Sequence, residues 1–405
     1  MVPNGWVKAA IKQLGDVSAG RQRSPNFTEG SVRPYLRVAN VFEAFIDTND
    51  VNEMPFTDKE FERYKLEPGD ILLNEGQSTE LVGRPAMYKG EPANCCFQNT
   101  LVRFKANDQV NQNYALQRFL LCLYDGTFQS ISKKTTSIAH LGVSRFADLK
   151  LAWPPLFEQN KIAQILSTWD EAITTTEQLL ANSQQQKIAL MQQLLTGKKR
   201  LLDKNGVRFE GEWKWLKANE LFRTVSTKNN SETEELLAVT QDQGVLPRSL
   251  LERRVAMPDG STKGYKLVVP GNFIISLRSF QGGLEYSNYR GLVSPAYTVL
   301  EPIRSIDDEF YKQYYKSYDF IGHLAVAVIG IRDGKQISYS DFSFLKLPYP
   351  GLEEQQKIAA VLSTADQEIS ALQQKLDALK QEKKALMQQL LTGKRRVKID
   401  DKEVA

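Results

Sequence analysis

Two short polar segments in the first half of the chain carry side chains suited to contacting a polyanion such as a nucleic acid. Arginine and lysine anchor phosphates, whereas small hydroxyl and amide groups can also reach base edges in a groove. The second half has similarly placed polar loops, and any single side chain could equally be a solvated loop charge. The candidate contacts are Gly76, Gln77, Ser78, Arg84, Lys133, Lys134, Thr135, Thr136, Ser137 and Arg145 in the first half, and Arg278, Ser279, Gln281, Arg332, Lys335 and Gln336 in the second.

No catalytic motif accompanies these segments. The sequence has no Gly-x-x-x-x-Gly-Lys-Ser/Thr phosphate loop, and Gln281-Gly282-Gly283 is a poor match to a dinucleotide or methyl-donor loop. Gly142-Val143-Ser144-Arg145 lacks the second glycine of a nucleophile elbow. Three cysteines and two histidines cannot supply two zinc sites. We therefore expect no catalytic residue, no metal site and no cofactor bound by this chain.

The overall charge neither supports nor excludes a nucleic-acid partner. The net charge is only +4, from 52 Lys and Arg against 48 Asp and Glu, although a basic face could exist beside an acidic one. The longest nearly uninterrupted apolar run, residues 324–331, is too short to cross a bilayer, and the first twenty residues lack an apolar signal core. An odd number of cysteines suits a reducing compartment. We expect a cytoplasmic protein with no membrane partner.

A repeated segment must position the candidate loops. Residues 158–200 and 354–396 align without a gap at an offset of 196, with 25 identities in 43 positions. Each copy follows a segment of different sequence that is long enough to form its own domain. The predicted division is a first domain at 1–155, a central repeat helix at 156–201, a second domain at 202–349, a C-terminal repeat helix at 350–397 and a tail at 398–405.

Each repeat has a seam of mainly apolar residues at alternating spacings of four and three, which is typical of a coiled coil. Gly197 and Gly393 stand where each helix should end. In the first copy, Leu179 and Ile188 could shift the seam locally. The seam residues are Ile162, Leu166, Trp169, Ile173, Thr176, Leu180, Ser183, Lys187, Leu190 and Leu194 in the first copy, and Ile358, Leu362, Ala365, Ile369, Leu372, Leu376, Leu379, Lys383, Leu386 and Leu390 in the second.

Two similar stripes in one chain can bury each other most simply as an antiparallel helix pair. A symmetric pairing places Ile162 opposite Leu390 and Trp169 opposite Lys383. We expect the Lys383 stem to lie on the Trp169 ring, a contact of roughly 0.5–2 kcal/mol. The alternative is that each helix packs only on its own domain.

The two domains share sparse landmarks. A Pro-Gly turn leads into an apolar strand in both, at Pro68-Gly69 and Pro270-Gly271. Short β-rich runs between Gly, Pro, Asn and Asp predict strands, and helical patches occur near residues 113–124 and 307–318. The predicted fold is α/β (α+β): two globular domains separated by two long helices that form an antiparallel coiled coil, with one domain scaffold whose loops have diverged.

In combination, these motifs resemble the DNA-specificity subunit of a Type I restriction–modification system. The resemblance covers nearly the whole chain. It is carried by residues 156–163 (LFEQNKIA), 352–359 (LEEQQKIA), the two terminal Leu-Thr-Gly runs, 35–41 (YLRVANV) and 68–72 (PGDIL). The second domain departs from the family pattern, because residues 237–240 (LAVT) replace a Leu-Arg-x-x-Asn stretch and Asn272 replaces an aspartate. Its half of the site is therefore less well defined.

The resemblance implies a division of labour. Two target-recognition domains would each read half of a split sequence in double-stranded DNA, and the helix pair would act as a ruler for the unread spacer. Two methyltransferase (modification) subunits would dock on the helices and methylate adenine with S-adenosylmethionine. Motor–endonuclease (restriction) subunits, with ATP and Mg²⁺, would cut unmethylated DNA. The specificity chain itself would be non-catalytic.

Two other readings remain open. The main one is a scaffold or adaptor in which two domains on a coiled coil assemble other proteins without binding DNA. The second is an enzyme with an unrecognised site. A methylation motif with two parts and a fixed gap would favour the DNA-specificity reading, whereas the absence of sequence-dependent DNA binding would favour the scaffold.

Overall fold

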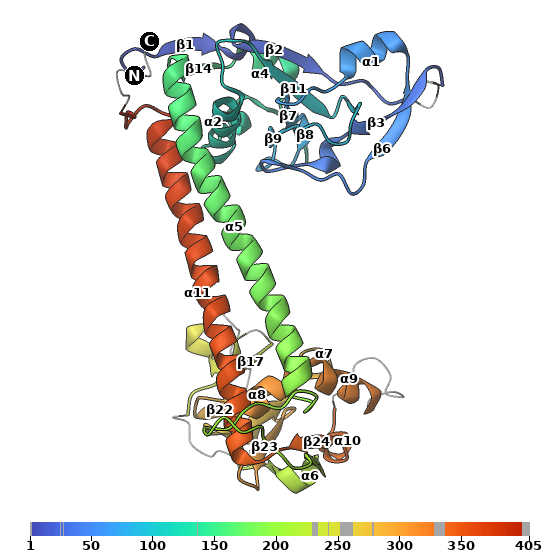
Figure 1. Cartoon of the computed structure of the whole chain (residues 1–405), viewed down its shortest axis with the longest axis vertical. Coiled ribbons are helices and arrows are strands. Elements are labelled where there is room, and N and C mark those ends of the chain that lie inside the picture. The colour runs from blue at the N-terminus through green and yellow to red at the C-terminus, as the bar shows by residue number, and fades with distance from the viewer. Residues whose placement is uncertain are drawn as a thin grey trace. The chain divides into compact units, whose positions relative to one another are not determined.

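The computed structural model describes residues 2–24, 26, 28–135, 137–228, 234–241, 243–251, 262–277, 279–327 and 337–398. The chain divides into two compact units, which we call the first unit (Met1–Thr176 with Lys375–Ala405) and the second unit (Glu177–Gln374). Each unit combines one globular domain with one part of each of two long helices (Figure 1). The division therefore cuts across both helices.

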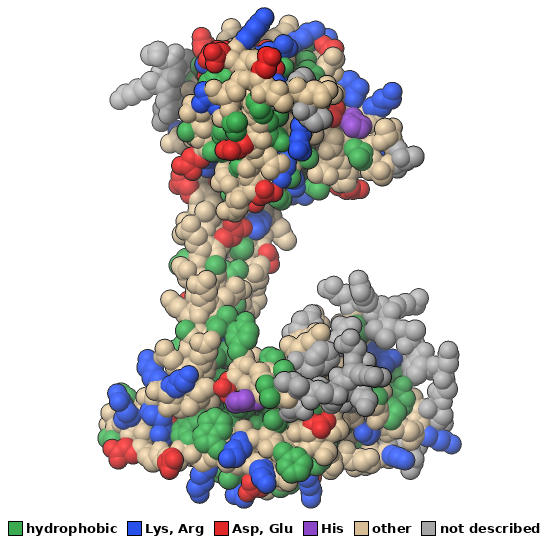
Figure 2. Space-filling view, turned by 90° about the vertical axis from the view of Figure 1, so that its right-hand side faces the viewer, with side chains coloured by type: hydrophobic (Ala, Val, Ile, Leu, Met, Phe, Trp, Pro, Cys, Tyr) green, Lys and Arg blue, Asp and Glu red, His purple; other side chains and the backbone are tan. Residues whose placement is uncertain are grey.

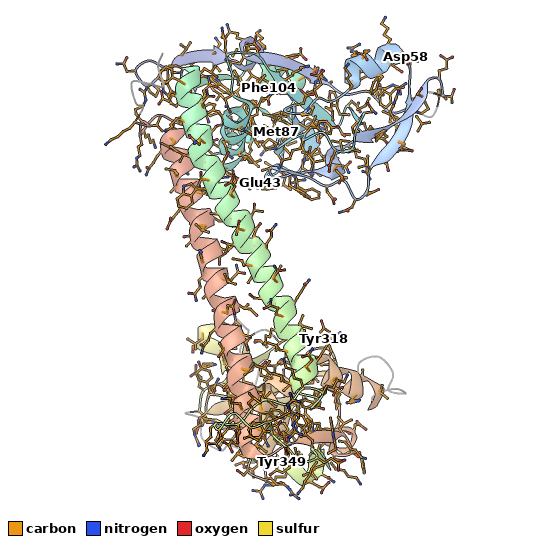
Figure 3. The ribbon with its side chains drawn as sticks, in the orientation of Figure 1. Glu43, Asp58, Met87, Phe104, Tyr318 and Tyr349 are labelled. Atoms are coloured by element: carbon orange, nitrogen blue, oxygen red, sulfur yellow. The ribbon has the colours of Figure 1, made fainter. Side chains whose placement is uncertain are left out.

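The first domain is built on an antiparallel four-stranded sheet in the order β2–β11–β7–β9. Helix α2 packs on this sheet, because Phe119 on its inner face meets Phe104 of β11 edge to face, with ring centroids 5.2 Å apart. Phe104 and Met87 belong to this core (Figure 3). The strands are β2 (Gly15–Ala19), β7 (Ile71–Asn74), β9 (Pro85–Met87) and β11 (Leu101–Ala106), and the helix is α2 (Gln112–Tyr124).

Smaller elements complete this domain. Strand β1 closes it by pairing with β14, the last strand before the long helix. Helix α1 begins at a capping box in which Thr57 accepts from the Glu60 N–H. The remaining bounds are β1 (Val7–Ala10), β3 (Ser31–Leu36), β4 (Val41–Phe42), β5 (Phe45–Ile46), β6 (Asn52–Phe56), α1 (Asp58–Tyr64), β8 (Gly76–Gln77), β10 (Cys96–Phe97), α3 (Thr127–Ile131), β12 (Lys133–Lys134), β13 (Ala139–His140), α4 (Val143–Asp148) and β14 (Lys150–Trp153).

The second domain repeats the main layers of the first. Its antiparallel four-stranded sheet has the order β16–β23–β20–β21, helix α8 packs on it, and β15 pairs with β24 at the entrance to the second long helix. The bounds are β15 (Lys214–Lys217), α6 (Ala218–Leu221), β16 (Phe222–Val225), β17 (Leu237–Thr240), β18 (Gly244–Pro247), β19 (Lys266–Val268), β20 (Phe273–Ile275), α7 (Ser279–Gly282), β21 (Glu285–Tyr286), β22 (Gly291–Val293), β23 (Thr298–Pro302), α8 (Asp308–Tyr315), α9 (Tyr318–Ala327), α10 (Tyr339–Ser343) and β24 (Lys346–Tyr349).

The long helices are α5 (Leu156–Leu194) and α11 (Leu352–Leu390), each 39 residues long. In the first unit, Ile162 near the start of α5 shares one core with Leu390 at the end of α11. In the second unit the order is reversed, and Leu194 shares a core with Ile358. The helices therefore pair antiparallel within each unit, as predicted. The end of α11 contributes to the first domain's core, so packing of each helix on its own domain alone is wrong.

The predicted seam is confirmed at all twenty positions, each of which is buried or half-buried. Leu179 and Ile188, which could have shifted the seam, are exposed. Both helices also end as predicted, since Gly197 and Gly393 have φ of 72° and 70°. This left-handed conformation closes a helix terminus and suits glycine.

The ammonium of Lys383 has a partner that we did not predict, and the contact of its stem with the Trp169 ring stays a prediction. The Lys383 Nζ atom lies 2.5 Å from Oδ1 of Asp170, the residue after Trp169. A carboxylate one position along the same helix binds the ammonium more strongly than the face of an aromatic ring. The lysine was correctly placed in the seam, but its polar contact is an ion pair.

The duplication extends to the polar contacts that join each domain to the helices. Glu158 is buried, and its carboxylate accepts two hydrogen bonds from Arg396, each 2.7 Å, and one from the Trp6 indole, 3.1 Å. In the second unit, the buried carboxylate of Glu354 accepts in the same way. Its donors are Arg200, at 2.6 and 2.8 Å, and the Trp213 indole, at 3.0 Å. Each buried carboxylate is thus paired with an arginine and further hydrogen-bonded, as burial of a charge requires.

Glutamines that follow these glutamates make a second repeated contact. Gln159 Oε1 accepts the Asn111 N–H at 2.9 Å, and Gln355 Oε1 accepts the Asp307 N–H at 2.9 Å. Asn111 and Asp307 are the residues that cap α2 and α8. The same helix start therefore holds the same domain helix in both units. Within the described residues, no helix is both long and apolar enough to cross a membrane.

Candidate nucleic-acid interface

A small three-stranded sheet in the first unit brings together two of the predicted segments. Strand β13 pairs with β12 on one side, with Lys133 opposite His140, and with β8 on the other, with Gly76 opposite His140. The segment containing Gly76, Gln77 and Ser78 and the segment beginning at Lys133 therefore lie on one surface, although 54 residues lie between Ser78 and Lys133 in the sequence. Lys133 and Lys134 are both exposed on the edge strand, where cationic side chains can reach phosphates.

The turn after β12 presents further polar groups. The Thr135 N–H and Oγ1 both donate to the Ile138 carbonyl, at 2.8 and 2.9 Å, which closes the turn between β12 and β13. Ser137 is exposed at this turn, and Thr136 lies outside the described residues. On the other edge, Gln77 Oε1 accepts the Ser78 N–H at 3.0 Å. Gln77 and Ser78 are half-buried, so their side chains are less accessible than those of the two lysines.

Arg145 supports this sheet from behind. Its NH2 group donates to the His140 carbonyl at 2.7 Å, and its Nε donates to the Leu141 carbonyl at 3.1 Å. His140 in turn lies with Nδ1 3.0 Å from Glu75 Oε2, beside β8. The guanidinium therefore holds the end of β13, and because the side chain of Arg145 is exposed, its predicted contact with DNA stays a prediction.

Arg84 leads to a feature that the sequence analysis missed. Its guanidinium lies 4.8 Å from the centroid of the Phe42 ring, in the hairpin formed by β4 and β5. Phe42 is 41% exposed and Phe45 is 59% exposed, and their rings lie 6.4 Å apart. Burial lowers the pKa of Arg84, but the guanidinium is still charged at neutral pH. The hairpin thus offers two apolar rings beside a cation, a combination suited to base or sugar surfaces.

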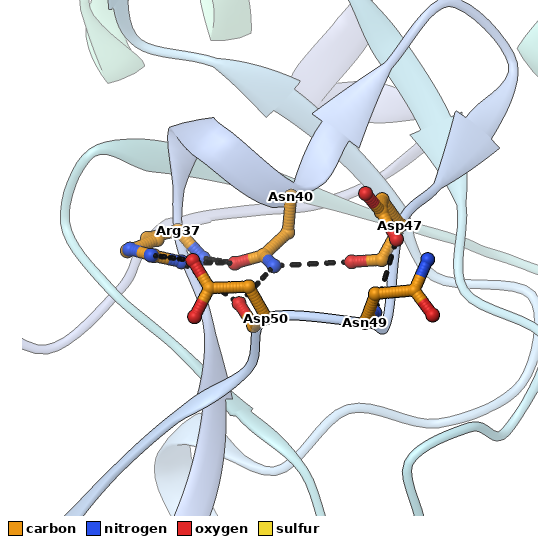
Figure 4. A network of polar contacts seen from close by, with 5 residues as sticks. All are labelled: Arg37, Asn40, Asp47, Asn49 and Asp50. Carbon is orange, nitrogen blue, oxygen red and sulfur yellow. Dashed lines mark hydrogen bonds and ion pairs between the residues drawn. The ribbon is translucent and has the colours of Figure 1, made fainter. Parts of the chain in front are cut away.

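The hairpin is held rigidly by a polar network around Asn40 (Figure 4). The buried Asn40 amide donates to the carbonyls of Asp47 and Asp50, at 3.0 and 2.9 Å. Arg37 NH2 donates to Asp50 Oδ2 at 2.7 Å, which closes the base of the loop. At its tip, Ala44 adopts a φ of 57°, which a side chain rarely adopts, and its N–H donates to the Pro85 carbonyl at 2.9 Å. Exposed rings on a braced and strained turn suggest a functional surface.

The YLRVANV segment (residues 35–41) is the sequence feature from which this loop could have been predicted. Arg37 and Asn40 lie within it, and they form the closing network that presents the next residues, Phe42 and Phe45. The exposure of the rings itself has no sequence signal, because an aromatic residue in a β-rich run is more often buried.

In the second unit, fewer of the predicted DNA-contacting residues belong to the part of the chain that the structure describes. Ser279 is only 1% exposed, and its Oγ accepts the Ser276 N–H at 2.8 Å, so its side chain stabilises the loop before α7 in this structure. Gln281 is exposed on α7. Arg278, Arg332, Lys335 and Gln336 lie outside the described residues.

The aspartate-to-asparagine difference between the domains has little structural consequence. Asp70 Oδ2 accepts the Glu67 N–H at 2.9 Å, and Asn272 Oδ1 accepts the Val269 N–H at 2.9 Å. Both side chains are buried and both close the Pro-Gly turn before a core strand. Burial raises the pKa of Asp70 above its ordinary value. The substitution therefore preserves the turn, and it does not separate the second domain from the scaffold of the first.

On the face of each unit that Figure 2 shows, Lys and Arg side chains lie among Asp and Glu. In the part of the chain that the structure describes, no cluster of three or more His, Cys, Asp or Glu could hold a metal ion. All three cysteines are buried and unpaired with one another, and burial raises the pKa of each thiol to about 12.

A comparison with protein families decides the relationship. The profile of the Type I restriction modification DNA specificity domain matches residues 3–182 and again residues 197–381. The chain belongs to this family. The two matches correspond to the two halves of the duplication, each with its domain and most of the long helix that follows.

Relatives of this specificity-domain chain agree with the match. A putative type I restriction enzyme MjaX specificity subunit from Methanocaldococcus jannaschii is 24% identical, over 98% of this chain and 95% of its own length. A chain in a structure titled for complex assembly and conformational transition of the type I R-M system has a TM-score of 0.60 at 16% identity, with 98% and 100% of the two chains covered. The crystal structure of the Type-I restriction-modification system S subunit from M. genitalium has a TM-score of 0.54 at 15% identity, with 99% and 100% covered. The predicted family and fold class are thereby confirmed.

Proposed function

We propose that the chain is the DNA-specificity subunit of a Type I restriction–modification complex, in which each domain reads one half of a split site in double-stranded DNA. The observation that carries this proposal is the repetition of the Glu–Arg–Trp contacts, at Glu158 and at Glu354, around two domains whose surface loops differ. A shared attachment with divergent loops is the arrangement expected when only the bases read have changed.

In the first domain, the contact surface is the β8–β13–β12 sheet together with the β4–β5 hairpin. Lys133 and Lys134 would anchor phosphates, and Gln77 would reach base edges. Phe42 and Phe45 would pack on sugars or insert at a base step, as exposed apolar wedges do in other DNA-binding proteins. In the second domain, Gln281 is the exposed candidate among the described residues.

The long helices would set the distance between the half-sites. At about 1.5 Å per residue, each heptad of helix corresponds to about 10.5 Å, or about three base pairs of B-DNA. Removing one heptad from both helices would therefore shorten the required spacer without changing either half-site. A change in base preference with an unchanged spacer would contradict the ruler.

The catalytic steps would belong to partner subunits. Two copies of a methyltransferase subunit would find equivalent docking surfaces, because the helix contacts of the two units are duplicated. They would use S-adenosylmethionine to methylate the site, and a motor–endonuclease subunit would use ATP and Mg²⁺. This chain would be a non-catalytic cytoplasmic component that binds none of these cofactors.

The decisive experiment is selection from a library of random-sequence DNA duplexes by the full chain, alone and with co-expressed neighbouring subunits. We expect the bound fraction to contain one motif with two defined parts and a fixed gap. Methylation mapping of the host genome should give the same motif. If the selected duplexes carried no common sequence, the non-DNA scaffold would be the better explanation.

A further inference from the structure

The seam between the long helices contains one lysine on each helix. Lys383 on α11 has only 11% of its side chain exposed, and Lys187 on α5 has 20%. Their positions differ by 196, the offset of the sequence repeat. Lysine is rarely buried unless its ammonium is paired, so both positions need an explanation in terms of their partners.

In the first unit, the partner is a carboxylate that joins three helices. Asp170 on α5 lies with Oδ1 2.5 Å from the Lys383 Nζ on α11. Its other oxygen, Oδ2, accepts a hydrogen bond of 2.7 Å from Nε2 of Gln117, on the domain helix α2. Gln117 is buried, so it holds the carboxylate in one orientation toward the seam.

The second unit contains the same junction. Asp366 on α11 lies with Oδ1 2.5 Å from the Lys187 Nζ on α5. Its Oδ2 accepts a hydrogen bond of 2.7 Å from Nε2 of Gln313, on α8. All three residues stand 196 positions from their counterparts in the first unit, with the roles of the two long helices exchanged. We call Lys383–Asp170–Gln117 and Lys187–Asp366–Gln313 the seam junctions.

Stability alone does not explain the seam junctions. Each aspartate side chain is 44% exposed, so solvent weakens its ion pair, and an apolar residue at the lysine position would pack against the seam at least as well. A polar residue at a coiled-coil core position instead specifies the register of the helices, at a cost in stability.

The apolar seam by itself leaves the register ambiguous, and the Glu158–Arg396 and Glu354–Arg200 contacts oppose a shift together with the junctions. Because the seam repeats every seven residues, a shift by one heptad would again place mostly apolar residues opposite one another. By the seam positions, Lys187 would then face Ile358 or Leu372 instead of Ala365, without Asp366 within reach. A buried ammonium opposite an aliphatic side chain is strongly disfavoured, so the junctions penalise the shifted registers.

We propose that the seam junctions are positioning residues that fix the register of α5 against α11 and thereby the spacer length between the two half-sites. The part that concerns DNA rests on the proposed function. A shift by one heptad moves the helices by about 10.5 Å, which corresponds to about three base pairs. The junctions therefore act on the gap in the site and leave the bases read by each domain unchanged.

The test uses the full chain with Lys187→Met and Lys383→Met, singly and together. Methionine keeps the length of the side chain and removes the ammonium, so the variants should unfold at the same temperature as the wild type or higher. We expect the double variant to select the same two half-sites from random-sequence duplexes. Its binding to duplexes with the gap changed by about three base pairs, relative to the native gap, should rise at least about tenfold.

Register can also be read without DNA. Cysteines at Ile173 and Leu379, which face each other in the native seam, should cross-link in the wild-type background. Cysteines at Ile173 and Leu386 report a shift by one heptad, and they should cross-link only when both lysines are methionine. The native cysteines are buried and should stay unreactive in the folded chain.

Glu171→Gln is the matched control, because it removes a charge from an exposed side chain next to Asp170. It should leave the gap and the cross-links unchanged. A double lysine variant that cross-linked only in the native register and kept a single gap would overturn the inference, whether or not its unfolding temperature fell. If the wild type selected no motif with two parts, the proposed function would fail, and the cross-links would still decide whether the junctions set the register.

Discussion

The two units use the same internal contacts to hold surfaces that differ. Glu158 and Glu354 make the same bonds to an arginine and a tryptophan, and the seam junctions recur at a fixed offset. The surfaces differ between the two units. In the first unit, core strand β7 is followed by β8 of the β8–β13–β12 sheet, whereas in the second unit the corresponding core strand, β20, is followed by helix α7. The attachment of the domains is therefore conserved within the chain, while the candidate contact loops are free to diverge. Substitutions in the shared attachment and in the contact loops can test this difference.

The largest effect is expected at the shared attachment. Glu158→Ala leaves the Arg396 guanidinium and the Trp6 indole without their buried acceptor, and it should cost roughly 2–4 kcal/mol of the free energy of unfolding of the first unit. Glu354→Ala should cost the second unit a similar amount. Denaturant unfolding and hydrogen exchange would measure both.

Glu158→Gln is the control, since it keeps an acceptor for the indole and should cost less. Clearly unequal losses for the two alanine variants would mean that the attachment is not equivalent in the two units.

The next effect concerns the first contact surface alone. Lys133→Ala with Lys134→Ala should lower DNA affinity about tenfold at moderate salt, and it should reduce the slope of log affinity against log salt by about 1.8, since each phosphate contact contributes about 0.9. Specificity at the second half-site should not change. Equilibrium binding at several salt concentrations measures both quantities. Lys89→Ala with Lys150→Ala removes two other exposed lysines of the same domain, and an equal fall in slope for this pair would remove β12 from the interface.

A smaller effect should come from the hairpin. Phe42→Ala with Phe45→Ala removes apolar contact without removing charge, so affinity should fall about three- to tenfold while the salt slope stays constant. Because both rings are exposed, the melting temperature should change little. Unchanged affinity for DNA together with weaker binding of a methyltransferase subunit would assign the rings to a protein interface instead.

The smallest effect compares the two Pro-Gly turns. Burial raises the folded-state pKa of Asp70 above the ordinary value of 3.8, so ionisation of Asp70 lowers stability as the pH rises through that raised pKa. Asp70→Asn should therefore raise the melting temperature slightly at pH 7 and have no such benefit once the carboxyl is protonated in both states. Asn272→Asp should do the converse and destabilise the chain at pH 7. Melting curves at pH 7 and at a pH well below 3.8 test both. A loss of stability in Asp70→Asn at pH 7 would show that the charge stabilises the turn through Arg103, whose NH1 lies 3.9 Å from Asp70 Oδ2.

Sequence reasoning succeeded for the helices and for the repeat because their signals are periodic and local. The apolar stripes that contain Ile162 and Leu390 could be identified from spacing alone, since a helix with a 3.5-residue apolar period must bury that stripe. The glycine at the end of each helix was equally readable. The small sheet could be predicted only in part. Gly76 and Lys133 were both identified as candidate DNA contacts, but nothing in the sequence places β13 between their strands.

The amino-acid sequence by itself determined the duplication, the positions of the apolar seam, the family and the segments that carry polar loops. The tertiary structure alone decided what individual polar side chains do: Arg145 supports β13, Ser279 is buried, Lys383 binds Asp170, and Phe42 and Phe45 are exposed. The reason is physical. Apolar periodicity is set by neighbours along one helix, whereas the partner of a polar group and the exposure of a ring depend on residues that only folding brings within a few ångströms.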